Sequence, residues 1–304
     1  MTRVLRVSLI AACAVLVMAA APAVAKKKHH KKSTKLGALV TRIGTGSEVV
    51  VAGQVSTASA TCPSGAKIVS GGFSAPFVPG AQMVVIESRR TSDVTWSVSA
   101  ISTGGGGAAT AYAYCRTGTH PISDVATTIV VPGGAGANII ANTTCPPGTF
   151  AISGGFESTR GPNAADFVQP MDSTGDASAW GGFYRNNGAA PQTATTHAYC
   201  MGGIKAPAER QNQIQLSEPV FGSVSETSPC LSSLKLTKKT KKGKRKLLHA
   251  LSGGGFLTSF PPAGPVLPVH VESHVAAGGV WLDRVVNGGT SAGIVPAQSA
   301  SVCY

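Results

Sequence analysis

Cysteine is the residue type whose spacing in this 304-residue sequence points most clearly to a chemistry. One of the seven cysteines, Cys13, lies in an apolar N-terminal stretch, and the other six are Cys62, Cys115, Cys145, Cys200, Cys230 and Cys303. In an exported chain, an even number of cysteines points to disulfide bonds. No C-x-x-C pair occurs, and the spacing matches no zinc pattern. We therefore expect structural disulfides, whose pairing the count alone leaves open.

A second set of residues could bind a metal ion. His270, Glu272 and His274 alternate along a segment with strand character, so regular alternation would place all three on one face. Two histidines and a carboxylate can hold a catalytic metal, which would make the chain a metal-dependent hydrolase. The competing interpretation is the polar face of a half-exposed strand, and we favour it for the reason given with the repeats below.

The N-terminus has the parts of a secretory signal. Two arginines precede an apolar run over residues 7–21, and small residues follow at 23 and 25. This pattern predicts a signal peptide over residues 1–25, cleaved after Ala25. The alternative is a lipoprotein signal with Cys13 as the lipidated residue, but the apolar run continues past Cys13 and leaves no polar tether. The apolar run is also too short to anchor in a bilayer, so we expect no transmembrane segment in the mature chain.

An internal repeat organises the rest of the sequence. The segment CPSGAKIVSGGF (62–73) returns as CPPGTFAISGGF (145–156), and a third copy opens at Cys230 and resumes as LSGGGF (251–256) after a lysine-rich insert. Each copy then contains an acid followed by serine, one tryptophan and a closing cysteine; these are Glu87, Trp96 and Cys115, then Asp172, Trp180 and Cys200, then Glu272, Trp281 and Cys303. Equivalent units should have equivalent bonds. The repeat therefore predicts the disulfides Cys62–Cys115, Cys145–Cys200 and Cys230–Cys303.

The segments between these landmarks are short, alternate between polar and apolar residues, and are separated by glycine and proline clusters. This pattern predicts about four to six antiparallel strands in each repeat, and thus an all-β protein. We place the basic N-terminal segment at 26–37 and the repeats at 38–119, 120–204 and 205–304, with the insert at about 231–250. The repeats could form one pseudo-threefold β-prism or three small β-sandwich domains in a row. Apolar linkers favour the compact form.

The recurring CPxG, SGGF, single Trp and closing Tyr-Cys resemble repeats of secreted proteins of uncharacterised function from high-GC Gram-positive bacteria. The Cys and Gly-Phe landmarks in triplicate are also similar to the vitelline membrane outer layer protein I family. That resemblance implies three sheets arranged as a β-prism. It covers about residues 38–304 and implies no catalytic residue.

Positive charge is concentrated in two segments of the chain. The first contains Lys26, Lys27, Lys28, Lys31, Lys32 and Lys35, and the second contains Lys235, Lys238, Lys239, Lys241, Lys242, Lys244, Arg245 and Lys246. Together they hold 14 of the 26 Lys and Arg residues; two more lie in residues 1–25, so 10 remain against 13 acids. Blocks of like charge are usually solvated, but in an exported protein they also suit anionic polymers. Neither segment contains a Phe, Tyr or Trp for base stacking, which disfavours nucleic acid as the partner.

Each remaining motif has a functional and a structural interpretation. The Gly-Gly pairs Gly71/Gly72, Gly154/Gly155 and Gly254/Gly255 could line a sugar-binding rim, or give room for the tryptophan rings. The repeated acid could bind a ligand, or accept backbone N–H bonds at a turn. We favour the structural interpretation of both, and also of the His270–His274 segment because the other repeats lack its histidines.

From the sequence we expect a secreted or cell-envelope-associated, non-enzymatic interaction protein without a cofactor. Its basic segments would bind an anionic envelope polymer or polysaccharide. A lectin-like carbohydrate-binding module and a metal-dependent hydrolase are the alternatives.

Overall fold

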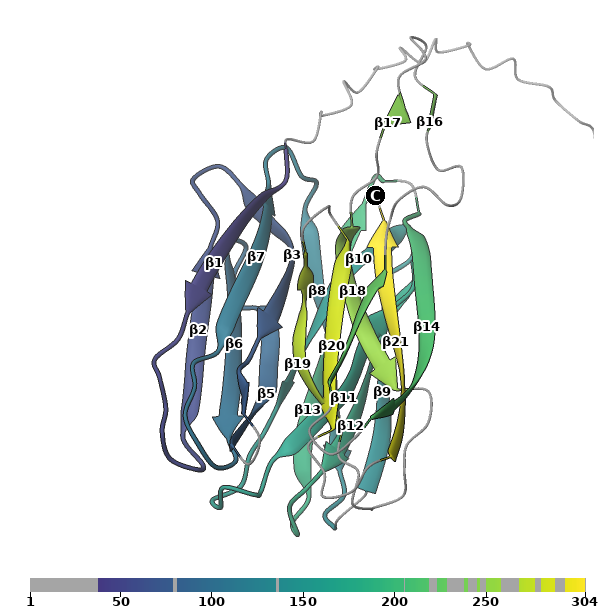
Figure 1. Ribbon diagram of the computed structural model, residues 1–304. Coiled ribbons are helices and arrows are strands. Elements are labelled where there is room, and N and C mark those ends of the chain that lie inside the picture. Colours follow the sequence, from purple (N-terminus) through teal and green to yellow (C-terminus); the bar gives the residue numbers. More distant parts are fainter. Residues whose placement is uncertain are drawn as a thin grey trace, which may run out of the picture. The chain divides into compact units, whose positions relative to one another are not determined.

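The fold consists of antiparallel β-strands (Figure 1). The computed structural model describes residues 38–78, 81–134, 137–204, 206–218, 223–228, 238–239, 245–246, 250–257, 268–276, 280–287 and 293–303. The chain divides into two units, 1–33 and 34–304, and all of these residues lie in the second. No helix occurs among the described residues. The predicted all-β class is confirmed.

The strands form three main groups. Sheet I has the order β1 (Val40–Thr45), β7 (Thr110–Arg116), β3 (Lys67–Ser74), β19 (Pro268–Val275), β20 (Trp281–Asn287) and β15 (Ser223–Ser228). Sheet II has the order β2 (Val55–Thr61), β6 (Thr95–Ser102), β5 (Ala81–Arg90), β10 (Thr149–Ser158), β13 (Gln192–Gly202) and β8 (Ile122–Val131), and β4 (Phe77–Val78) pairs with β5. Sheet III consists of two three-stranded ladders. The first has the order β9 (Ala137–Thr144), β12 (Ala179–Asn186) and β11 (Val168–Gly175), and the second has the order β18 (Ala250–Leu257), β21 (Gly293–Cys303) and β14 (Ala208–Glu218). The two ladders meet where β11 lies beside β18. A separate pair, β16 (Lys238–Lys239) and β17 (Arg245–Lys246), lies in the insert.

Each sheet is shared by two repeats. Sheet I joins strands of repeats 1 and 3, sheet II joins repeats 1 and 2, and sheet III joins repeats 2 and 3. The joins are β3 with β19, β5 with β10, and β11 beside β18. Every repeat thus divides its strands between two sheets. Two of the joins are strand pairings and the third is a contact between two ladders, so the described strands are shared among the repeats and do not form three separate sandwich domains in a row.

Two β-bulges recur at equivalent places in the three repeats. The first precedes the Ser-Gly-Gly motif, at Ile68/Ser70, Ala151/Ser153 and Ala250/Ser252. The second precedes the repeated acid, at Val85/Glu87, Pro170/Asp172 and His270/Glu272. A bulge adds one residue to a strand and increases its twist. These bulges lie on the strands at which two repeats meet, where a change of twist lets one repeat continue into the neighbouring sheet.

The three tryptophans lie in the core. Trp96, Trp180 and Trp281 are each no more than 2% exposed. In each repeat the indole Nε1–H donates to the serine that follows the repeated acid, over 3.1 Å to Ser88, 2.9 Å to Ser173 and 3.1 Å to Ser273. This bond satisfies the one polar atom of a buried indole. The acid-Ser motif and the tryptophan therefore act together as a structural pair, and the prediction of a core tryptophan is confirmed.

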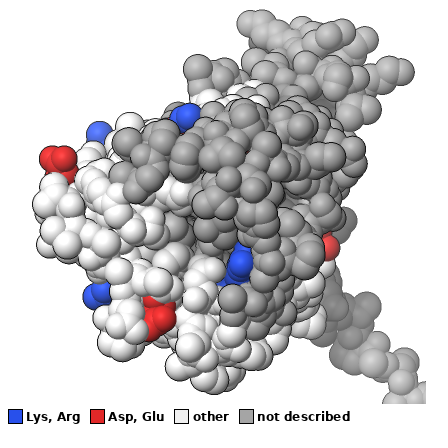
Figure 2. Space-filling model, turned by 60° about the horizontal axis from the view of Figure 1, so that its bottom comes forward, with Lys and Arg blue, Asp and Glu red and all other residues white. Residues whose placement is uncertain are grey.

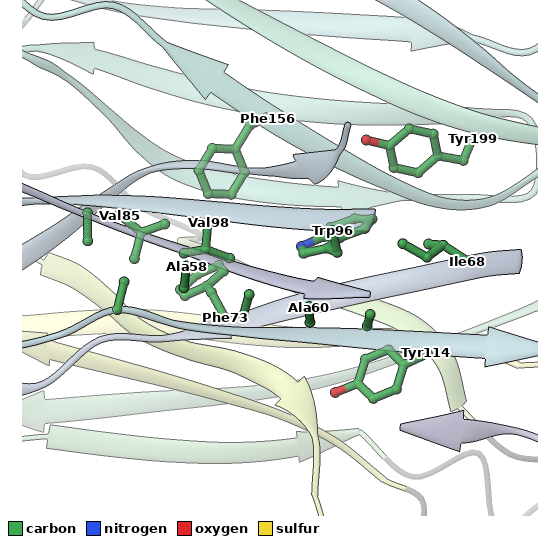
Figure 3. Close-up of a cluster of buried hydrophobic side chains, with 14 of the residues drawn as sticks. Ala58, Ala60, Ile68, Phe73, Val85, Trp96, Val98, Tyr114, Phe156 and Tyr199 are labelled. Atoms are coloured by element: carbon green, nitrogen blue, oxygen red, sulfur yellow. The ribbon is translucent and has the colours of Figure 1, made fainter. Parts of the chain in front are cut away.

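One buried cluster draws residues from all three repeats. Figure 3 shows Phe73 and Phe156, from different repeats, together with Trp96 and Tyr199 in the same interior. The two phenylalanine rings meet edge to face at 6.0 Å between centroids. The tyrosines of the Ala-Tyr-Cys motif join neighbouring repeats, since the Tyr199 hydroxyl accepts the Arg90 N–H and the Tyr114 hydroxyl accepts the Val275 N–H, both at 2.7 Å.

The paired glycines are buried and serve close packing. A Cβ at Gly71 would overlap the indole of Trp96, and one at Gly154 would overlap that of Trp180. A Cβ at Gly72 would overlap the Ser273 carbonyl, on the strand contributed by the neighbouring repeat. The first glycine of a pair therefore makes room for the ring and the second for the adjoining strand. These pairs do not line an exposed sugar-binding rim.

In the third repeat, the register shifts the pair by one residue from its expected position. Gly71 pairs with Ala113, which lies two residues before the closing Cys115. In the third repeat, the residue paired two positions before the closing Cys303 is Gly253, opposite Ser301. The equivalents of Gly71 and Gly72 are thus Gly253 and Gly254. Gly255, predicted as the second glycine of the pair, takes the register position of Phe73. The alignment anchored on Phe256 missed this because the third copy contains one extra glycine.

Two of the three predicted disulfides are present. Cys62 bonds to Cys115 and Cys145 bonds to Cys200, each with a Cα–Cα distance of 5.7 Å. Each bond joins the first cysteine of a repeat, which follows its second strand, to the closing strand of that repeat. Cys230 and the side chain of Cys303 lie outside the described part of the structure, so the third disulfide remains a prediction.

Candidate functional site

The basic residues are the predicted binding groups, and the structure places four of them. Lys238 pairs with Lys246, and Lys239 with Arg245, in the antiparallel β16–β17 hairpin. The other residues of that cluster, Lys235, Lys241, Lys242 and Lys244, lie outside the described residues, as do Lys26, Lys27, Lys28, Lys31 and Lys32. The predicted signal peptide and Cys13 also fall there. Part of the second basic cluster thus has a defined strand register.

The repeated acid lies on the strands at which two repeats meet, not at a turn. Glu87 on β5 and Glu272 on β19 each follow a bulge and bond to side chains of their surroundings. Glu87 accepts the Ser99 hydroxyl at 2.8 Å, and Glu272 Oε1 lies 3.4 Å from Arg284 Nη1. The expectation that this acid caps backbone N–H groups at a turn is not met at these two sites. The residue instead forms cross-strand contacts on the sheet face.

In sheet II these contacts extend into a polar network between repeats 1 and 2. Arg89 Nε lies 3.0 Å from Glu87 Oε1 and 2.8 Å from Glu157 Oε2, so it bridges the two repeats. His197 Nδ1 lies 3.0 Å from Asp124 Oδ1, a hydrogen-bond distance. Its Nε2 lies 3.7 Å from Glu157 Oε1, an ion-pair distance. Glu157 is therefore shared between a guanidinium and an imidazole.

The network keeps His197 protonated at neutral pH. Burial alone would lower the pKa of His197, but the hydrogen bond and charge of Asp124 and the charge of Glu157 outweigh it and raise the pKa to about 9. His197 in turn lowers the pKa of Glu157, with a further contribution from Arg89 that opposes the effect of burial. The cluster is a set of mutually compensated charges.

This charge pairing predicts a pH-dependent stability. Because folding raises the pKa of His197 from 6.5 to about 9, its contribution is complete below pH 6.5 and is lost as the pH rises through 9. We expect the free energy of unfolding to fall by roughly 1–2 kcal/mol across this window, a value reduced by the partial exposure of the two carboxylates. Denaturant titrations of the wild type and of His197→Gln at several pH values test this. An equal pH dependence in both proteins would contradict it.

The equivalent join in sheet I carries aromatic and charged groups. The Tyr112 ring of repeat 1 stacks on the His274 ring of repeat 3, with 4.4 Å between centroids and 17° between planes. His274 Nδ1 is 3.1 Å from the Val275 carbonyl, which leaves Nε2 facing Glu272 at 3.8 Å. The stack covers one face of each ring. The stack is thus a contact between repeats 1 and 3.

The predicted metal-binding face does not form as expected. His270 pairs with Val285 and Glu272 with Arg284, with a bulge between them. Val285 and Arg284 are adjacent on β20 and lie on opposite faces, so His270 and Glu272 also lie on opposite faces. Among the described residues, no group of three or more His, Cys, Asp or Glu residues could hold a metal ion. The bulge, which regular alternation cannot reveal, separates His270 from Glu272, while His274 stays beside Glu272.

The repeated acid of the third join, Asp172 in sheet III, is buried. Burial and the nearby charge of Asp283 raise the pKa of Asp172 well above its usual value. Asp172 also borders a cavity lined by Phe73, Phe156, Ser173 and Ser273. The water-accessible volume of this cavity is about 20 Å³, which is enough for roughly one water molecule. This cavity is too small for an organic substrate.

Sequence reasoning missed His197, Asp124 and Arg89, which together with Glu157 form the polar network between repeats 1 and 2. His197 and Arg89 have no equivalents of the same type in the other repeats. A search for repeated landmarks therefore passes over them. The one available signal was the alternation of polar residues along β13 and β5, which indicates an outward face but not the partners on it.

Comparison with known proteins does not add a family. No protein-family model matches the chain. A search of curated proteins finds no relative. Within the part of the chain that the structure describes, no helix combines the length and apolar character needed to cross a membrane.

Proposed function

We propose that this is an exported, non-enzymatic interaction protein, in which a disulfide-closed β body carries two basic segments that bind anionic polymers of the cell envelope. The observation that supports this most is the separation of charge. The two segments hold 14 of the 26 Lys and Arg residues, while the rest of the chain from residue 36 has 10 such residues against 13 acids.

Four cations of the body, Lys67, Arg89, Arg90 and Arg284, form ion pairs with its own acids. Lys67 Nζ lies 2.6 Å from Asp93, and Arg90 Nη2 lies 3.3 Å from the same carboxylate. Arg89 is held by two glutamates and Arg284 by one. Figure 2 shows one face of the molecule, on which described residues of both signs are scattered among uncharged ones. Attraction for a polyanion would therefore come from the basic segments.

The stable β body fits a role outside the cell as the support for the two basic segments. Two disulfides indicate an oxidising environment. The interior packs around three buried tryptophans, and the glycine pairs of repeats 1 and 2 are buried with them. Each Lys or Arg close to an anionic surface contributes roughly 1 kcal/mol, and salt screens the contribution within about 8–10 Å. Several cations acting together would thus retain the protein on an anionic polymer at moderate salt.

Retention on purified cell wall tests the proposal. We expect the full-length protein to bind wall that carries anionic polymer and to be released by salt. Replacing Lys26, Lys27 and Lys28 by Gln should weaken binding about tenfold or more, given about 1 kcal/mol for each charge. A control matched in charge replaces Arg42, Lys67 and Arg160 of the body by Gln and should change binding far less. Equal losses in the two variants, or binding that resists salt, would contradict the proposal.

A further inference from the structure

The contact between repeats 2 and 3 lacks the strand pairing that forms the other two joins. In sheets I and II, β3 pairs with β19 and β5 pairs with β10. In sheet III, β11 pairs with β12 and β18 pairs with β21, and in the described part of the chain no ladder joins β11 to β18. β11 also contains Pro170, which has no N–H to donate to a ladder. The β11–β18 seam is therefore a place where two repeats can separate without breaking ladder hydrogen bonds between them.

Asp172 places a carboxyl group at this seam. Its Oδ1 atom is buried and has no hydrogen-bond partner. The residue borders the same small cavity as Ser173 of its own strand and Ser273 of repeat 3. At the equivalent places, Glu87 accepts a serine hydroxyl and Glu272 contacts a guanidinium. The charged form of Asp172 is thus less compensated than the charged forms of the other two repeated acids.

The surroundings of Asp172 favour its neutral form. Burial, followed by the charge of Asp283 on β20, raises the pKa of Asp172 well above its usual value. Of the strands packed against β11, β18 and β21 contain no Asp, Glu, His, Lys or Arg. The ionisable groups on the other strands packed against it are Tyr184 and Arg185 on β12, Glu157 on β10, Glu87, Arg89 and Arg90 on β5, His197 and Tyr199 on β13, and His270, Glu272 and His274 on β19. Among the described residues, none of these cations forms an ion pair with Asp172.

We propose that the β11–β18 seam is a pH-dependent opening point of the fold, which is closed while Asp172 is neutral and weakened when Asp172 ionises. A buried carboxylate without a partner is costly, and separation of the two strands lets water reach it. This inference is independent of the proposed function.

The direction of the pH dependence follows from linkage. Folding raises the pKa of Asp172 above the value of about 3.9 in an unfolded chain. The stability of the closed seam is therefore complete below about pH 4 and is lost as the pH rises through the raised pKa of Asp172.

Hydrogen exchange of the full-length protein tests the proposal, with each rate corrected for the intrinsic effect of pH. In the wild type we expect the backbone amides of β11 and β18 to exchange at least threefold faster at pH 9 than at pH 5, relative to those of β2 and β6 in repeat 1. Asp172→Asn keeps the shape of the side chain and removes its charge. We expect this variant to slow exchange at the seam at least fivefold at pH 9 and to remove the difference between the two pH values.

Glu87→Gln is the matched control, because it makes the same change of charge at the equivalent place in sheet II. We expect it to leave exchange at the β11–β18 seam unchanged and not to slow exchange in β5. Equal exchange of Asp172→Asn and the wild type at pH 9 would overturn the proposal. The wild-type pH series needs no variant, and an equal acceleration in all sheets would also overturn the proposal, because ionisation would then destabilise the whole fold and not the seam.

Discussion

Replacing Gly71 by alanine is expected to destabilise the protein by about 3 kcal/mol or more, although only one methyl group is added. The added Cβ would overlap the indole of Trp96. That ring is 1% exposed, and its Nε1–H is committed to Ser88, so it cannot move aside without losing a buried hydrogen bond. Chemical denaturation of the variant and the wild type measures the difference.

Two comparisons identify the cause of this loss. Gly202→Ala is the matched control, because a Cβ there would meet Thr149 Cγ2 at an ordinary 3.5 Å, and we expect a change within about 1 kcal/mol. Combining Gly71→Ala with Trp96→Leu should cost less than the sum of the two single changes, by about 1 kcal/mol or more. Additive effects would show that the glycine and the ring do not interact.

Removing the Cys62–Cys115 disulfide by replacing both cysteines with alanine is expected to cost about 4 kcal/mol in the chain-entropy model. The bond spans 53 residues and ties the end of β2 to the closing strand of repeat 1, β7. Cys115 is fully buried, so truncation also removes packed atoms there. Denaturant unfolding of the double variant under oxidising conditions measures the loss.

The third repeat provides the companion test of this prediction. If Cys230 and Cys303 are bonded, as their equivalence to the other pairs predicts, replacing both should cost a similar amount. A protease cut within residues 238–246 should then leave two fragments joined until a reductant is added. Peptide mapping that finds free thiols, or a bond between cysteines of different repeats, would contradict the threefold pairing.

Several features were predictable because they depend on residues within one repeat. The pairings Cys62–Cys115 and Cys145–Cys200 follow from comparing copies of one motif, and both are present. The burial of Trp96 and the packing of a ring against Gly71 follow from the residue types alone. The partner of the indole, Ser88, was visible as a landmark, but its role was not.

The candidate site was predictable only in composition. The basic clusters can be read directly from the residues, but the cross-strand pairing of Lys239 with Arg245 cannot, because register depends on which residues face each other. The same reason explains the error at His270. One bulge residue moves it to the other face of β19, and no pattern in the strand itself marks that bulge.

By itself the sequence determined the strand class, the two disulfide pairs Cys62–Cys115 and Cys145–Cys200, the recurrence of one motif and the concentration of basic residues in two segments. All of these depend on residue type and on spacing along one copy. Only the tertiary structure decided that each sheet is shared by two repeats, that Gly255 takes the place of a phenylalanine, and that Glu157 lies between Arg89 and His197. Those contacts join strands that are distant in the sequence, and their geometry is set by how bulged and twisted strands from different repeats pack against one another.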